Sequence, residues 1–385
     1  MIKKLFTLVV VLFPILGIYI SPISGFDLGT FCLLLLLPFL LSGNFKIRIP
    51  LYMFLLIMYI LLGSLIAYTV SEPSDLALAM LRMGKFIITV VIVFIIAKEK
   101  FFDYQFAKKM LKIITISAVS YIIIQSILFY KTGRLLPSVP FNLIRNEEYG
   151  TIDYSQAASI FYRPASFFLE PAHFAQYVVV YLTYCLFGDF QKTEPQLIAA
   201  VFITIGLFVS TSGQGILLSF LIWTFWLFNQ LAKSGITRKI YLIIFCILLG
   251  LIVLPKVFQT EIVSTSINRI ITDSGLGVAS KGRLFSYYYF NELPLLQKII
   301  GTGYGNVPAG VYLNSAAYIL YCNGIIGMVI VGMLFYDAFR HARYFQRYLC
   351  IIYALLIMGS ATFTASGIVF YFMFIYSDYN KRVYL

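Results

Sequence analysis

Long apolar runs separated by short polar stretches recur along almost the whole of this chain. In a bilayer, a run of about 20 such residues spans the hydrocarbon core as a helix, because every backbone polar group must find its hydrogen bond within the segment. Ala361-Thr362 alone separates the last two runs, which predict either a tight hairpin or one bent segment. The runs lie at residues 5–22, 27–43, 51–70, 77–97, 111–130, 171–188, 197–211, 214–230, 240–254, 311–335, 347–360 and 363–378.

These runs predict an all-α polytopic membrane protein with about 12 transmembrane helices. The chain has 385 residues, of which 61% are hydrophobic and 12% charged, whereas about a quarter of the residues in a soluble domain are charged. Little chain is left for soluble mass, so we expect a single integral membrane domain over residues 1–385. A net charge of +13 suggests nucleic-acid binding in a soluble protein. Here basic cytoplasmic loops account for the charge, so no nucleic-acid partner is expected.

The distribution of lysine and arginine predicts the orientation of the helices. With the N-terminus in the cytoplasm, the inside loops hold about twice as many basic residues as the outside loops, as the positive-inside rule requires. An even number of helices returns the C-terminus to the cytoplasm. Two long loops, about 131–170 and 255–310, then emerge on the outer face with the turn at Ser210–Gly215. Their shared side indicates one external site at the membrane surface.

The densest group of polar residues in this apolar chain lies at residues 161–175. Pro171 suits the first turn of a helix, which places Glu170 at the helix N-terminus and His173 in the first turn. Two interpretations stay open. Arg163 binds an anion and Glu170 acts as a base in an external site, or Glu170 caps the helix and Arg163 lies at the membrane interface.

The second long loop holds Arg269 and Arg283, followed by the aromatic run 285–290 and the glycine-rich segment Gly301–Asn306. An arginine can bind phosphate through two parallel hydrogen bonds, which makes Arg283 a candidate phosphate ligand. The tyrosines of the aromatic run either stack on sugars or, as we favour, form a belt at the membrane surface. The glycine-rich segment lacks the Gly-Lys-Ser/Thr ending of a nucleotide-binding loop and predicts a sharp backbone turn.

Arg82 and Lys85 lie three residues apart on one face of the run 77–97. Charges inside a membrane helix are costly, so they either neutralise a lipid diphosphate or line a polar cavity, or else they extend to the outer headgroups. The five cysteines lie in apolar runs without paired spacing, and the chain has only two histidines. We therefore expect no metal site and no cofactor.

Four motifs follow one another along the chain. They are Arg163-Pro164-x-Ser166-Phe167-Phe168-x-Glu170-Pro171-x-x-Phe174-Ala175, then Ser210-Thr211-Ser212-Gly213-x-Gly215, then Arg283 followed by Gly301-Thr302-Gly303-Tyr304-Gly305-Asn306, and finally Asn314 with Asn323-Gly324-Ile325-Ile326-Gly327. In these motifs and their order the chain resembles the Wzy-type O-antigen and exopolysaccharide polymerases, within the O-antigen ligase/polymerase superfamily. The resemblance covers residues 160–330, whereas the N-terminal third agrees only as a set of hydrophobic helices.

The resemblance implies a membrane glycosyltransferase that needs neither nucleotide sugar nor metal. Such enzymes join oligosaccharide repeat units carried on undecaprenyl diphosphate at the outer face of the bacterial cytoplasmic (inner) membrane. The growing chain moves to the non-reducing end of the next lipid-linked unit, which yields O-antigen, capsule or exopolysaccharide. Membrane lipid is the surrounding partner, and a chain-length regulator and a flippase are further candidate partners.

A lipid diphosphate leaves as a stable anion, so the reaction needs fixed positive charge more than it needs a proton donor. The acceptor hydroxyl needs a base. The candidate catalytic residues are Glu170 as the base, with His173 as the second choice, and Arg163 and Arg283 as the groups that stabilise the anion. The candidate substrate-binding residues are Arg82, Lys85, Arg269, Tyr304, Asn314 and Ser212.

Other functions stay open on the sequence alone. An O-antigen ligase of the same superfamily resembles this layout but carries a functional histidine before the late helix, where this chain has Tyr312-Leu313-Asn314-Ser315. A lipid-linked oligosaccharide flippase more often shows two similar halves and small outer loops. A plain transporter or channel leaves the long outer loops unexplained.

Overall fold

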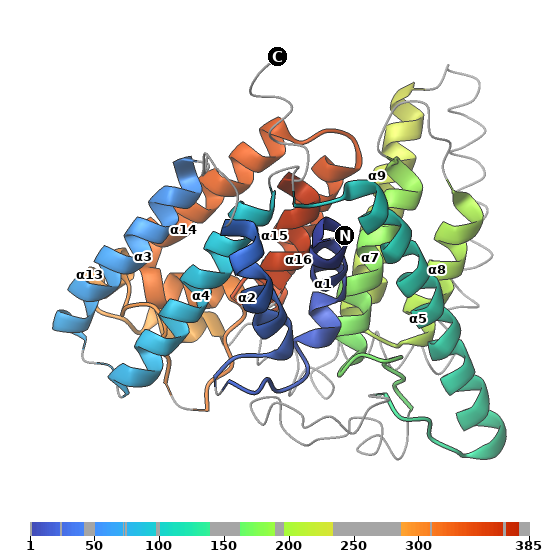
Figure 1. Ribbon diagram of the computed structural model, residues 1–385, viewed down its shortest axis with the longest axis horizontal. Helices are drawn as coiled ribbons and strands as arrows, with labels where there is room; N and C mark the ends of the chain where they lie inside the picture. Colours follow the sequence, from blue (N-terminus) through green and yellow to red (C-terminus); the bar gives the residue numbers. More distant parts are fainter. Residues whose placement is uncertain are drawn as a thin grey trace. The chain divides into compact units, whose positions relative to one another are not determined.

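The computed structural model of the chain is α-helical throughout the residues that it describes, apart from turns, irregular segments and an isolated bridge between Ile20 and Asp27. Figure 1 shows the helices coloured along the sequence. The all-α class is therefore confirmed for these parts of the chain. The described residues are 2–23, 25–41, 51–71, 73, 75–97, 101–138, 162–188, 196–233, 286–308, 310–364 and 367–376.

The apolar runs of the sequence become helices wherever the structure describes them, while the run at 240–254 lies outside the described residues. The helices are α1 (Ile2–Leu16), α2 (Leu28–Leu41), α3 (Leu51–Val70), α4 (Leu76–Ala97), α5 (Tyr104–Thr132), α7 (Pro171–Phe187), α8 (Leu197–Val209), α9 (Gly213–Lys233), α13 (Leu295–Ile300), α14 (Ser315–His341), α15 (Phe345–Gly359) and α16 (Gly367–Tyr376).

Five helices in the described residues are long and apolar enough to cross a membrane, namely α3, α4, α5, α9 and α14. Shorter apolar helices accompany them, among them α2, α8, α15 and α16. A chain with this many apolar helices has the architecture of a multi-pass membrane protein.

Several helices begin where the sequence supplies a cap. The side-chain oxygens of Asp27, Asp103 and Asn314 each accept a hydrogen bond from the backbone N–H three residues further on, at 2.7, 3.0 and 2.9 Å, at the starts of α2, α5 and α14. Helix α7 instead has Pro171 at its first position. Each device deals with N–H groups that have no partner within the helix, which matters most where water is absent.

The chain divides into two compact units, and one of the boundaries between them falls within α5. The first unit comprises Met1–Lys112, Asn142–Thr151 and Lys281–Leu385, and the second comprises Ile113–Phe141 and Ile152–Ser280. Each unit is described below by itself.

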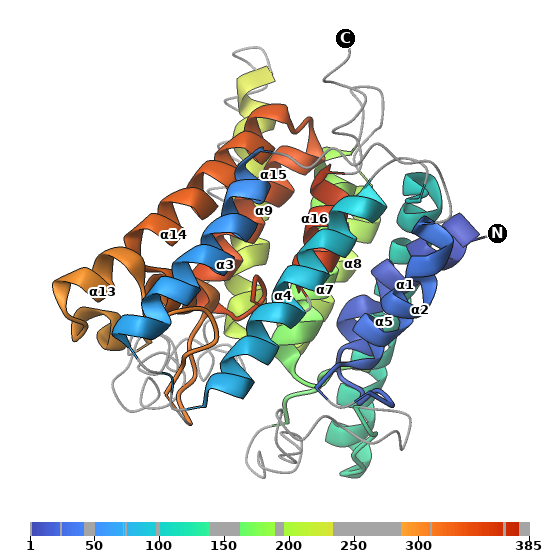
Figure 2. The same cartoon turned by 60° about the vertical axis from the view of Figure 1, so that its left-hand side comes forward.

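Helix α14 is the centre of the first unit, where it packs against α3, α13 and α15. Figure 2 shows α3 alongside α14. Helix α16 packs against α1 and α4, and α1 packs against α2. Within α14, Gly324 has φ +64 and breaks the regular helix into two parts.

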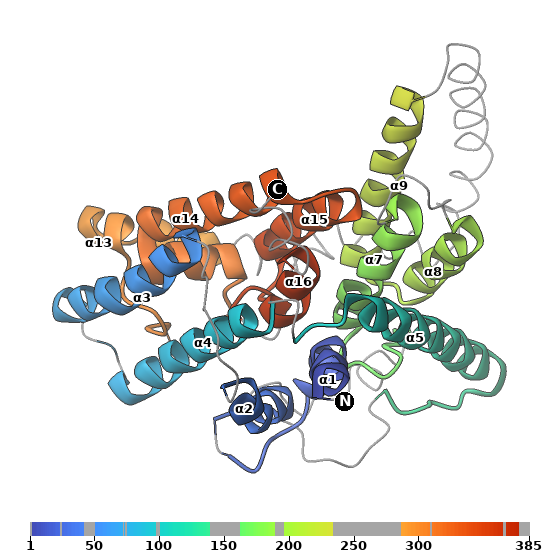
Figure 3. The same ribbon diagram turned by 45° about the horizontal axis from the view of Figure 1, so that its top comes forward.

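The last two apolar runs form a helical hairpin rather than one bent segment. The Gln346 side chain at the start of α15 donates a hydrogen bond of 3.1 Å to the Phe374 carbonyl near the end of α16, so the two helices run antiparallel. The rings of Tyr353 and Tyr371 stack between them with centroids 4.4 Å apart. Figure 3 shows α15 and α16 side by side. This pairing answers the question that the sequence left open.

In the second unit, α7 packs against both α8 and α9, and most of its residues are buried. Small residues allow close approach at two of these contacts. A Cβ atom on Gly215 of α9 would lie 2.8 Å from Cβ of Ala175 in α7, and one on Gly206 of α8 would lie 2.8 Å from a methyl group of Val119 in α5. Glycine at the helix contact is the usual means of close packing in membranes, where burial of apolar surface gives no driving force between helices.

Candidate functional site

The segment that carries Arg163 and Glu170 is docked on α5 at its N-terminal end. Tyr162 is buried, and its ring stacks on Phe129 with centroids 4.4 Å apart and an interplanar angle of 25°. Such a stacked pair adds to the apolar burial of both rings. The residue before Arg163 is therefore fixed to α5, while Arg163 itself is half-buried.

Ser166 anchors the middle of the segment and has an unusual backbone. Its φ is +57, in the left-handed region that residues other than glycine rarely adopt. The Ser166 N–H donates to Oε1 of Gln125 at 2.9 Å, and Nε2 of Gln125 donates back to the Ser166 carbonyl at 3.2 Å. The Ser166 hydroxyl donates to the Ala118 carbonyl at 2.8 Å. Both side chains are fully buried, so α5 holds this backbone in place through three hydrogen bonds.

Glu170 is the residue that immediately precedes α7. It is half-buried, and its side chain makes no capping hydrogen bond to the helix that follows. Nor does its carboxylate form a hydrogen bond or an ion pair with any other described residue. His173 lies in the first turn of the same helix, three residues further along the chain. Glu170 thus occupies the capping position of α7 without acting as a cap.

The Ser/Gly turn between α8 and α9 lies beside the N-terminal turns of α7. Gly215 touches Ala175 closely, and Nε2 of Gln176 donates to Oε1 of Gln214 at 3.0 Å. Ser212 is buried, and its hydroxyl oxygen accepts a hydrogen bond of 3.3 Å from the Gly215 N–H at the start of α9. The first two sequence motifs are therefore neighbours in the second unit, within two helical turns of Glu170.

The third and fourth motifs meet in the first unit, where the segment Gly301–Asn306 enters the break in α14. The N–H groups of Thr302 and Gly303 donate to the carbonyls of Tyr321 and Cys322 at 3.0 and 2.9 Å. These are carbonyls that the break at Gly324 deprives of helical partners. The glycine-rich segment therefore makes the sharp turn that was expected, and it also completes the hydrogen bonding of a broken membrane helix.

The same segment is fixed by α3 and α4. The Tyr68 hydroxyl donates to the Tyr304 carbonyl, and the Tyr304 N–H donates to the Ser64 hydroxyl at 2.9 Å. Nη1 of Arg82 donates to the Gly305 carbonyl at 3.2 Å. One role of Arg82 is thus to hold a backbone carbonyl inside the first unit.

Other candidate residues of the first unit also have partners within the fold. Lys85 forms an ion pair with Asp27, with Nζ 3.3 Å from Oδ2. The Tyr304 ring is buried against Phe86, with centroids 4.9 Å apart, and burial raises the pKa of Tyr304 well above its ordinary value. Asn314 is fully buried, caps α14, and donates weakly to the Ser286 hydroxyl at 3.4 Å. These contacts favour structural roles for Lys85, Tyr304 and Asn314.

The described residues therefore place Arg163, Glu170, His173 and Ser212 in the second unit and Arg82, Lys85, Tyr304 and Asn314 in the first. Arg269 and Arg283 lie outside the described residues, as does most of the loop expected at 255–310. Within the described ranges, no group of three or more histidine, cysteine, aspartate or glutamate side chains lies close enough to hold a metal ion.

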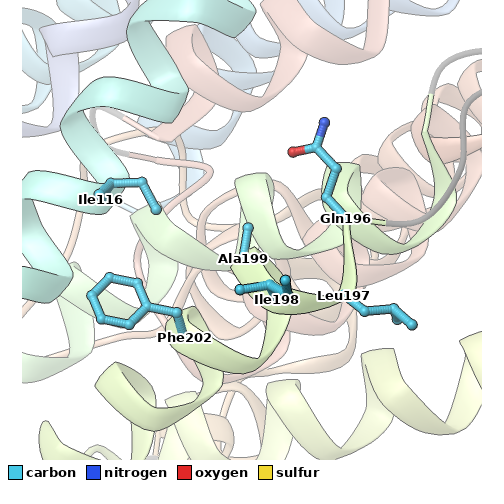
Figure 4. A pocket seen from close by; sticks show the side chains of 6 residues that line it. All are labelled: Ile116, Gln196, Leu197, Ile198, Ala199 and Phe202. Carbon is cyan, nitrogen blue, oxygen red and sulfur yellow. The ribbon is translucent and has the colours of Figure 1, made fainter.

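An apolar pocket of about 630 Å³ opens near the start of α8, at the opposite end of this helix from the Ser/Gly turn. Figure 4 shows Ile116 of α5 and Phe202 of α8 on one side and Gln196 on the other. Gln196 and Ser210 stand at opposite ends of α8, a helix of 13 residues and about 20 Å in length. None of the described residues that line this pocket is charged, so they offer no cation to a diphosphate.

No protein-family model matches this chain, and no curated protein is similar enough to it to establish a relationship.

Two residues that sequence analysis passed over prove important to the geometry. Gln125 holds Ser166, and Asp27 both caps α2 and pairs with Lys85. The signal for Gln125 was an amide inside the apolar run 111–130, because a polar side chain in a membrane helix usually needs a partner. The signal for Asp27 was weaker, since a lone acidic residue before an apolar run indicates a cap and nothing more.

Proposed function

We propose that this chain is a polysaccharide polymerase of the bacterial cytoplasmic membrane. It joins oligosaccharide repeat units carried on undecaprenyl diphosphate into O-antigen, capsule or exopolysaccharide at the outer face of the cytoplasmic membrane. In this proposal the chain crosses the membrane about 12 times, with both termini in the cytoplasm and the two long loops outside.

The observation that carries the proposal is the uncommitted carboxylate of Glu170 in an ordered, half-buried setting. Structural carboxylates in apolar surroundings normally have a cation or a helix N-terminus as partner, because an unpaired buried charge is costly. Glu170 lies at the N-terminus of α7, but its side chain accepts no hydrogen bond from that helix and forms no ion pair with a described residue, although the backbone on both sides of it is fixed. A carboxylate held ready in this way suits a general base.

The reaction that we propose is a displacement at the anomeric carbon of the donor sugar. An acceptor hydroxyl on the next lipid-linked unit forms the new C–O bond, and its proton passes to the Glu170 carboxylate. The bond between the anomeric carbon and the diphosphate oxygen breaks, and undecaprenyl diphosphate leaves with the electron pair. Because that leaving group is a stable anion, it needs positive charge rather than a proton.

Arg163 and Arg283 are the proposed partners of the diphosphate, since a guanidinium stays charged and matches two phosphate oxygens at once. Arg163 supports this role by its place in the same docked segment as Glu170. His173, in the first turn of α7, is the second candidate for the base. The growing chain, the lipid-linked unit, a chain-length regulator and a flippase are the partners that this function requires.

Deletion of the gene in its source bacterium tests the function against its rivals. We expect single repeat units on the surface acceptor and no long chains, which polyacrylamide electrophoresis of the extracted polysaccharide resolves. Full-length polymer that accumulates on the lipid carrier would indicate a ligase instead. Units retained on the cytoplasmic face would indicate a flippase.

Three single substitutions test the site itself. We expect Arg163→Ala, Glu170→Gln and Arg283→Ala each to abolish long chains in the deletion strain, while immunoblots show normal amounts of protein in the membrane. Removal of a general base typically lowers the rate by about 10²–10⁴-fold. Wild-type chain lengths in the Glu170→Gln strain would exclude Glu170 as the base, and wild-type lengths in all three strains would exclude the whole site.

A further inference from the structure

Gln125 stands out among the buried polar side chains of the second unit. It lies in the second half of the apolar helix α5, is 0% exposed, and exchanges two hydrogen bonds with the backbone of Ser166, which is 41 residues away in the sequence. Its Nε2 also lies 3.5 Å from the carbonyl oxygens of Leu136 and Pro137. A carboxamide is costly to place inside a membrane helix, so its presence there calls for a specific partner. The partner in this case is a segment outside any helix.

The backbone that Gln125 binds cannot hold its conformation unaided. Ser166 has φ +57, which brings the Cβ of a residue other than glycine too close to its own backbone. Left-handed residues of this kind persist only where the surrounding structure imposes them, and they cluster at functional sites. Here the imposing groups are the Gln125 side chain and the Ala118 carbonyl.

The hydrogen bonds from Gln125 to the Ser166 backbone, which we call the clamp, act between two candidate catalytic residues. Ser166 follows Arg163 by three residues and precedes Glu170 by four. The flanks of the segment are held separately, by the Tyr162 ring on Phe129 and by Phe168, whose ring lies 5.3 Å from that of Tyr177. Fixing the direction of the chain at Ser166 therefore fixes how Arg163 and Glu170 are presented relative to each other.

We propose that Gln125 is a positioning residue, which acts on the reaction through the Ser166 backbone by setting the geometry of Arg163 and Glu170. This inference rests on the proposed function, because it assumes that these two residues serve the transfer reaction. A displacement of about 1 Å at a reacting group can cost about 10²-fold in rate, so a loosened clamp should affect turnover more than binding.

The test uses the full-length protein in lipid nanodiscs, with lipid-linked repeat units extracted from the deletion strain as substrate. We expect Gln125→Leu, which keeps the size but removes both hydrogen bonds to the Ser166 backbone, to lower kcat about tenfold or more while KM stays within about threefold. Gln125→Met is the second variant, since its flexible side chain fills the same space. Gln125→Glu keeps an acceptor for the Ser166 N–H and should recover part of the lost kcat.

Gln230→Leu is the matched control, because Gln230 is a half-buried glutamine of α9 without a side-chain hydrogen bond to any described residue. It should retain wild-type kcat. Ser166→Gly should lose less activity than Gln125→Leu, since glycine adopts φ +57 freely and keeps the N–H and carbonyl that Gln125 binds.

Each outcome decides the matter. Wild-type kcat in Gln125→Leu, while Glu170→Gln is inactive, would overturn the positioning role and leave the proposed function standing. An active Glu170→Gln would instead overturn the base on which this inference depends. A rise in KM alone would mean that Gln125 serves binding. If none of the three Gln125 variants accumulates in the membrane, the residue serves folding and the inference is wrong.

Discussion

Gly324 shows at the scale of one residue how this fold accommodates an interruption in a membrane helix. With φ +64 it turns α14 out of its path, and the space beside it is filled by backbone. A Cβ atom there would meet the Ile299 carbonyl, so both the conformation and the space require glycine.

We therefore expect Gly324→Ala to destabilise the protein by about 2–4 kcal/mol, as the sum of the left-handed strain and the overlap with backbone. Gly332→Ala is the control in the same helix, because a Cβ atom at Gly332 would meet nothing within 4 Å. It should stabilise the helix by up to about 1 kcal/mol. Thermal unfolding in nanodiscs measures both changes. Equal melting temperatures for the two variants would contradict the requirement for glycine.

At the scale of elements, the contact between α7 and α9 connects helix packing with the candidate site. Gly215 lets α9 approach Ala175 of α7, one turn beyond Glu170, and the paired side chains of Gln176 and Gln214 span the same contact. A change in the distance between α7 and α9 should therefore shift the start of α7, where Glu170 lies.

Substitution of Gly215 by alanine tests this connection. The added methyl group would lie 2.8 Å from Cβ of Ala175, and we expect it to push α9 outward at a cost of about 1–3 kcal/mol. Chain length in the deletion strain should fall along with the melting temperature. Gly84→Ala in α4 meets nothing within 4 Å and should leave chain length unchanged. A stable Gly215→Ala protein with normal chain lengths would separate the helix contact from the site.

At the scale of the whole molecule, the apolar runs were sufficient to predict the helices, because a bilayer allows an apolar run few other structures. The apolar runs could not reveal which polar groups form hydrogen bonds with residues far away in the sequence. Gln125 and Ser166 are 41 residues apart, and Ser64 and Tyr304 are 240 apart. For this reason the motif around Glu170 was recognisable, while the clamp that holds it and the burial of Tyr304 were not.

The orientation of the molecule is open to a direct test. With the N-terminus in the cytoplasm, the segment around residue 275 lies outside, so a cysteine introduced as Ser274→Cys in a background without the native cysteines should react with a membrane-impermeant maleimide in intact cells. The positive-inside distribution of lysine and arginine is the physical reason. Labelling that occurs only after lysis would reverse the orientation and place the candidate site on the cytoplasmic side.

The hydrogen bonds between α3 and the glycine-rich segment also determine how late in synthesis the first unit can be completed. Ser64 and Tyr68 belong to α3, which is synthesised early. The backbone at Tyr304 that they bind is synthesised 236 to 240 residues later. At a synthesis rate of about 5–20 residues per second, the ribosome takes roughly 10–50 s to reach it. During that interval the nascent chain holds hydroxyl groups in the bilayer without their final partners. Until these partners are made, the unpaired hydroxyl groups are a feature by which membrane quality control can recognise an incomplete chain.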